Sequence, residues 1–130
     1  MWKYAIAIVL VAHGIGQILP FLAAWTNEKI LSDTSWLFFA GVGIRTPIGQ
    51  AFALLGLIAL LGFVGGALGF LFGQGWWPPL LISASILSLT VAIPWAAAWP
   101  MGSLIGNVLV DVAILVALLT PWGRQLAHAI

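Results

Sequence analysis

The stretch AFALLGLIALLGFVGGALGFLFG, residues 51–73, decides the fold, because it runs for 23 residues without a charged side chain. An apolar run of about 18 or more residues without charges is typical of a transmembrane helix. Strands of a membrane barrel alternate apolar and polar residues over about ten positions, whereas this run is continuously apolar. A helix also satisfies its backbone hydrogen bonds within one segment, as lipid requires. The stretch therefore predicts a membrane-spanning α-helix.

The rest of the chain has the same character. Of its 130 residues, 63% are hydrophobic and 5% are charged, whereas soluble domains carry about a quarter charged residues. Residues 46–110 contain no charged side chain, which excludes a soluble protein. The net charge of +1 implies no nucleic-acid partner. The lack of cysteine excludes disulfides, thiol chemistry and cysteine-bound metals.

Four apolar segments predict one all-α domain over residues 1–130, an integral membrane four-helix bundle. The expected helices span about 2–25, 47–72, 78–99 and 102–122, with a long loop at 26–45 and two short turns. Short connections make neighbouring helices antiparallel.

Two local features modify this outline. Pro94 falls inside the third expected helix, where it predicts a static kink and frees the carbonyl of Thr90. The apolar run from Trp36 to Phe39 predicts a short interfacial segment within the long loop, lying on the membrane or over the helix ends.

Glycines predict where helices approach closely. Small residues four positions apart let two helix backbones come together. The second expected helix has three overlapping pairs of this kind, and the fourth has one. This pattern favours packing within the bundle; the alternative is a face for another subunit or a flat cofactor. The glycines are Gly62, Gly65, Gly66, Gly69, Gly73, Gly102 and Gly106.

One pair of ionisable residues lies deep in the expected helices. His13 is near the middle of the first helix and Asp111 near the middle of the fourth, and such groups are functional candidates in a membrane. Gln17 and Asn107 lie one turn away on the same faces. When two helices run antiparallel, the residue numbers of any two residues that face each other add up to the same value. The numbers of His13 and Asp111 add up to 124, and so do those of Gln17 and Asn107, so the two pairs fit one register. The sequence predicts a buried polar cluster of these four residues.

The cluster has two interpretations. The first is a structural clasp, in which the two groups share a proton and join the first and fourth helices. The second is a site for a proton, a quinone head group or a metal-bearing pigment. One histidine, one carboxylate and two amides are too few for a metal held by protein ligands alone. No catalytic residue is predicted, and the hydroxyls of Ser83, Ser85, Ser88 and Thr90 are assigned no chemistry.

Four helices in a chain of this length, with the longest loop first, resemble the DoxX/DoxD-like group of small bacterial and archaeal membrane proteins. The nearest local feature is the run from His13 to Gln17 that leads to Pro20 and Phe21. The charged residues that flank the first helix in that group are not matched here, and no functional residue is carried over. The resemblance implies a component of a quinone-linked redox system in a prokaryotic plasma membrane.

Basic residues do not decide the membrane orientation. Lys3 and Arg124 lie on the side of the termini, and Lys29 and Arg45 lie on the other, so the positive-inside rule ties. The terminal side has no acidic residue and carries the α-amino group. We therefore expect both termini in the cytoplasm.

Three functions fit these observations. The first is a non-catalytic subunit of a larger membrane complex, which associates with other membrane subunits or with itself in the lipid bilayer. The second is a quinone- or proton-handling redox subunit that uses His13 and Asp111. The third is a small oligomeric carrier or channel.

Overall fold

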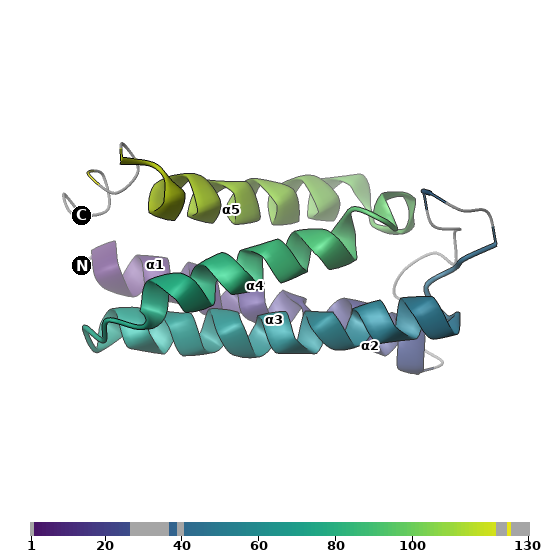
Figure 1. Ribbon diagram of the computed structural model, residues 1–130, viewed down its shortest axis with the longest axis horizontal. Coiled ribbons are helices and arrows are strands. Elements are labelled where there is room, and N and C mark those ends of the chain that lie inside the picture. Colours follow the sequence, from purple (N-terminus) through teal and green to yellow (C-terminus); the bar gives the residue numbers. More distant parts are fainter. Residues whose placement is uncertain (1, 27–36, 39–40, 122–124, 126–130) are drawn as a thin grey trace.

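The computed structural model describes residues 2–26, 37–38, 41–121 and 125, and its regular structure is helical throughout. Figure 1 shows the helices running side by side along one long axis. The all-α architecture expected from the sequence is confirmed. In chain order the elements are α1 (Trp2–Gly16), α2 (Ile18–Trp25), α3 (Pro47–Leu71), α4 (Trp77–Ala92), η1 (Ala96–Ala98) and α5 (Met101–Leu119).

Three segments are long and apolar enough to cross a membrane: Trp2–Trp25, Pro47–Leu71 and Met101–Leu119. The first consists of α1 and α2, which follow each other along the chain. Helix α4 has 16 residues, so it is about 24 Å long at 1.5 Å per residue. That is shorter than the hydrocarbon core of about 30 Å.

The expected first helix is interrupted at Gln17, and Pro20 explains why. Proline has no amide hydrogen, and its ring clashes with the carbonyl four residues earlier, here that of Gly16. The amide of Gln17 instead bonds to the carbonyl of Gly14 over a 2.9 Å distance, which is a tighter turn than the α-helix makes. The interruption lies beside the candidate polar cluster.

Helix α3 matches its expected limits because the sequence marks both ends. Pro47 occupies the first turn, and the hydroxyl of Thr46 accepts a hydrogen bond from the amide of Gly49. After Leu71, Gly73 adopts a positive φ of 67°, which glycine reaches without the steric cost of a side chain.

The expected continuation of the third helix to residue 99 is wrong. Helix α4 ends at Ala92, and Pro94 lies in the following turn rather than at a kink. A proline cannot donate to the carbonyl four residues before it, so the helix stops instead of bending. The Pro94 carbonyl accepts a hydrogen bond from the amide of Leu37 at 2.8 Å.

The donor of that hydrogen bond, Leu37, belongs to the expected interfacial segment. Leu37 and Phe38 are exposed, and the amide of Leu37 ties this part of the loop to the end of α4. Trp36 and Phe39 lie outside the described residues. At the same end, the side chains of Arg45 and Gln50 donate to the last carbonyls of α2.

Helices α3 and α4 pack closely through glycines of α3. A Cβ atom added at Gly62 would lie 2.9 Å from the Cβ of Ala84, and one at Gly69 would lie 2.8 Å from the ring of Trp76. Gly66 faces Leu81 in the same way, and Gly65 has ordinary contact distance to Leu80. This face is therefore where two helices of the same chain meet.

The other glycines of the predicted packing face have different surroundings. A Cβ atom added at Gly73, Gly102 or Gly106 would meet nothing within 4 Å. Gly73 serves the turn after α3. Gly102 and Gly106 lie on an exposed face of α5, where the described chain supplies no packing partner.

Candidate functional site

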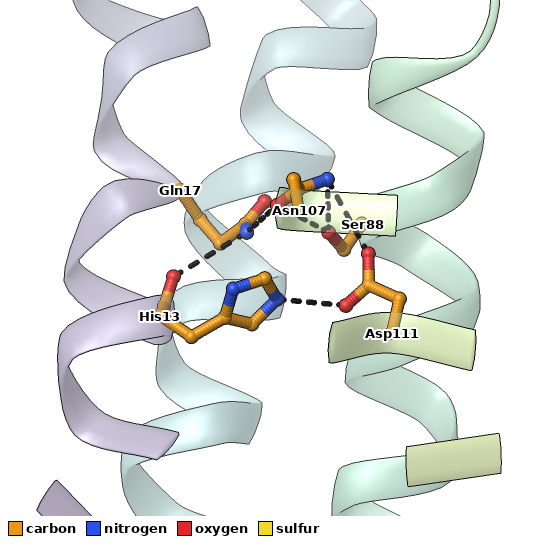
Figure 2. A network of polar contacts seen from close by, with 5 residues as sticks. All are labelled: His13, Gln17, Ser88, Asn107 and Asp111. Atoms are coloured by element: carbon orange, nitrogen blue, oxygen red, sulfur yellow. Dashed lines mark hydrogen bonds and ion pairs between the residues drawn. The ribbon is translucent and has the colours of Figure 1, made fainter. Parts of the chain in front are cut away.

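Halfway along the bundle, the Nε2 atom of His13 lies 2.8 Å from Oδ1 of Asp111. His13 comes from α1 and Asp111 from α5, as Figure 2 shows. The side chain of Asp111 is 0% exposed and that of His13 is 9% exposed. A buried charge is stabilised only when it is paired and hydrogen-bonded, and the two residues supply that pairing to each other.

The second predicted pair lies one turn away. The amide nitrogen of Gln17 donates to Oδ1 of Asn107 at 2.9 Å, and Gln17 is also buried. The same nitrogen lies 3.4 Å from the carbonyl of His13. The structure therefore brings all four residues of the predicted cluster together.

Sequence reasoning missed a fifth member, Ser88 of α4. The Ser88 hydroxyl lies 3.3 Å from the amide nitrogen of Asn107 and 3.4 Å from its amide oxygen. The Asn107 nitrogen also approaches Oδ2 of Asp111 at 3.4 Å. Ser88 is fully buried, and in Figure 2 it lies next to Asn107, on a third helix.

A signal for Ser88 was present in the sequence. The middle of the expected helix 78–99 falls between residues 88 and 89, which is the level that His13 and Asp111 have in their helices. The general tendency of helix hydroxyls to bond their own backbone made Ser88 unremarkable. Ser85, one turn earlier, is also fully buried, and its hydroxyl has no hydrogen-bond partner in the described chain.

Aromatic and glycine residues shape the space around His13. The ring of Phe63 meets the imidazole edge-on, with ring centroids 4.7 Å apart. A Cβ atom added at Gly14 would lie 2.8 Å from the Cβ of Phe63, so glycine lets α1 approach α3 at this level. These contacts fix the position of α1, and with it the position of the imidazole.

The side chains of the cluster themselves offer proton exchange and hydrogen bonding. Amides and hydroxyls donate and accept hydrogen bonds, and His13 and Asp111 are the two ionisable members of the cluster. Among the described residues no group of three or more His, Cys, Asp or Glu side chains lies close enough to hold a metal ion. The cluster also lacks a nucleophile with an adjacent base.

Comparison with known proteins adds no assignment: no family model, no curated protein and no solved structure matches this chain. The fold and site define a class, namely a small helical protein with spans apolar enough for a membrane and an ionisable pair halfway along them. The resemblance to DoxX/DoxD-like proteins stays a prediction.

Proposed function

We propose that this protein is a small integral membrane subunit that binds a proton in the middle of the bilayer, at the pair formed by His13 and Asp111. The observation that carries the proposal is the 2.8 Å contact between a fully buried carboxylate and an imidazole on another helix. Ionisable residues within membrane spans are costly, and they mark proton and ion pathways. The apolar lengths of the three long segments support insertion in a bilayer.

The residue types support proton binding in particular. An imidazole and a carboxyl group that share one proton carry no net charge as a pair, whereas gaining or losing a proton leaves one unit of buried charge. No titratable side chain occurs between residues 46 and 110, so neither α3 nor α4 can compensate that charge. The pair is therefore the group that determines the charge at this level of the bundle.

Proton uptake by the purified protein tests this function. The wild type in lipid nanodiscs should take up protons after a jump to lower pH, as measured with an indicator dye. Asp111→Asn should remove one uptake step, and Val112→Ala, at an exposed neighbour, should keep it. Equal uptake by the wild type and a folded Asp111→Asn variant would contradict the proposal.

The cellular setting belongs to the same proposal. The protein would be a multi-pass protein of a prokaryotic plasma membrane with both termini in the cytoplasm. The resemblance to DoxX/DoxD-like proteins extends the proposal to a quinone-linked redox system. A quinone in solvent extracts of the wild type, and its loss in His13→Ala, would support this extension.

A second candidate is a non-catalytic structural subunit, and one observation favours it. Helix α5 leaves Gly102 and Gly106 without a packing partner in the described chain, so another membrane helix could approach there. In that case the polar cluster would be only a clasp. A stoichiometric partner that still co-purifies with the His13→Leu/Asp111→Leu variant would favour this candidate over proton binding.

A further inference from the structure

Helix α5 is held to the bundle in an unusual way. Among its residues only Asp111 is buried, whereas α3 buries eight residues, all of them glycine, alanine or phenylalanine. Its main packing partner is α4, and Figure 1 shows α5 as the outermost helix, along the top of the view. The single residue that α5 buries is thus an ionisable one.

Halfway along the bundle, α5 contacts α1 and the residue that follows it through polar side chains. His13 bonds Asp111, and Gln17 bonds Asn107. Apolar contact is more limited: Ile114 and Leu118 of α5 are partly buried and pack against the core that α1, α3 and α4 form. By contrast, α1 packs closely against α3 at Gly14, where an added Cβ atom would lie 2.8 Å from the Cβ of Phe63. Of the two helices that the pair joins, α5 is therefore the one that is less buried in the rest of the bundle.

We propose that the protonation state of the His13–Asp111 pair controls how closely α5 is held against α1. This inference rests on the proposed proton-binding function and adds its consequence. With one shared proton the pair has no net charge, and the contact holds α5 in place. A second proton leaves an imidazolium beside a neutral carboxylic acid, and loss of the shared proton leaves an uncompensated carboxylate. Either state places a net charge in an apolar interior, which is unfavourable, and displacement of α5 relieves it.

The groups that face the pair are few enough to name. From α1 there is His13 itself, and from the turn between α1 and α2 there is the amide of Gln17. From α5 there are Asp111 itself and the amide of Asn107. Helix α3 presents Phe63, and α4 presents Ser88. Among the described residues none of these neighbours is ionisable, so we assign the pH response to the pair.

Pulsed electron spin resonance can measure this movement. The chain has no cysteine, so pairs of spin labels can be introduced without background. One pair, Val9→Cys with Val116→Cys, joins exposed positions of α1 and α5, and the control pair, Val9→Cys with Leu68→Cys, joins α1 and α3. We expect the distance distribution between α1 and α5 to be narrow near neutral pH and to broaden or lengthen at acidic and at alkaline pH. The distribution between α1 and α3 should stay constant.

Variants separate this inference from the function on which it rests. In the Asp111→Asn background the change at alkaline pH should be lost, because no carboxylate remains, whereas the change at acidic pH should persist, because His13 can still gain a proton. In the His13→Leu/Asp111→Leu variant the distance between α1 and α5 should not depend on pH. If the wild type takes up the proton at Asp111 but its α1–α5 distribution does not change, proton binding stands and control of α5 is refuted. If the distribution changes equally in the wild type and in a folded His13→Leu/Asp111→Leu variant, the movement has another cause and the inference fails. If neither uptake nor movement depends on Asp111, both proposals are overturned.

Discussion

His13 and Asp111 are 98 positions apart in the sequence, and their side chains meet at 2.8 Å in the interior of the bundle. The contact joins α1, the first helix, to α5, the last. Because the Asp111 carboxylate is fully buried, the loss of either partner leaves the other as a buried polar group without its hydrogen bond. The energetic and functional consequences of this dependence can be measured.

Single and double substitutions of the pair should not have additive effects. His13→Leu or Asp111→Leu alone leaves a buried polar partner without its hydrogen bond, which costs about 1–3 kcal/mol, and more if the partner stays charged. The double variant leaves no such orphan, so its free energy of unfolding should fall by less than the total of the singles. Unfolding in detergent micelles, followed by circular dichroism, measures all three variants. If the losses of unfolding free energy in the two single variants add up to the loss in the double variant, the contact does not contribute to stability.

The glycines of α3 and α5 should respond differently to the same substitution. In Gly62→Ala the new Cβ atom would come within 2.9 Å of Ala84, and overpacking of this kind costs about 1–3 kcal/mol. Gly106→Ala meets nothing within 4 Å, and alanine favours a helix over glycine by up to about 1 kcal/mol. Thermal unfolding should therefore occur at lower temperature for the first variant and at an unchanged or higher temperature for the second. The opposite order would contradict the packing of α3 against α4.

The topology predicts that the two termini share one side of the membrane. The four crossings that the sequence predicts would place Gln125 on the side opposite the loop that contains Ser32. In sealed vesicles, a membrane-impermeant thiol reagent should label Ser32→Cys and Gln125→Cys from opposite faces. Labelling of both positions from one face would contradict four crossings, and with them the antiparallel register of α1 and α5.

The sequence predicts most of the fold because charges and prolines mark the helix ends. Pro47 begins α3, and the apolar run up to Leu71 contains no interruption. Two prolines inside apolar runs limit the helices: Pro20 follows the interruption of the first helix at Gln17, and Pro94 follows the end of the third, where the sequence predicts a kink. Hydropathy does not register these effects, because proline acts through a missing amide hydrogen and a steric clash.

The candidate site was predictable where it depends on helix register. In antiparallel helices, two residues at the middle of their spans lie at one level, which brings His13 to Asp111 and Gln17 to Asn107. The part played by Ser88 depends on how α4 is rotated against α5. The apolar pattern of α4 does not determine that rotation, because the helix is apolar on nearly all sides.

The central claim is that His13 and Asp111 bind a proton together, and site-resolved titration of the two groups tests it most directly. Nitrogen-15 NMR of the His13 ring reports its protonation state, and infrared difference spectroscopy reports the carboxylic acid band of Asp111. Both can be recorded in lipid on the same samples across a range of pH. The account predicts that the two signals titrate as a coupled pair, and that the pH at which His13 titrates shifts in Asp111→Asn. A His13 titration that is identical in the wild type and in Asp111→Asn would contradict it.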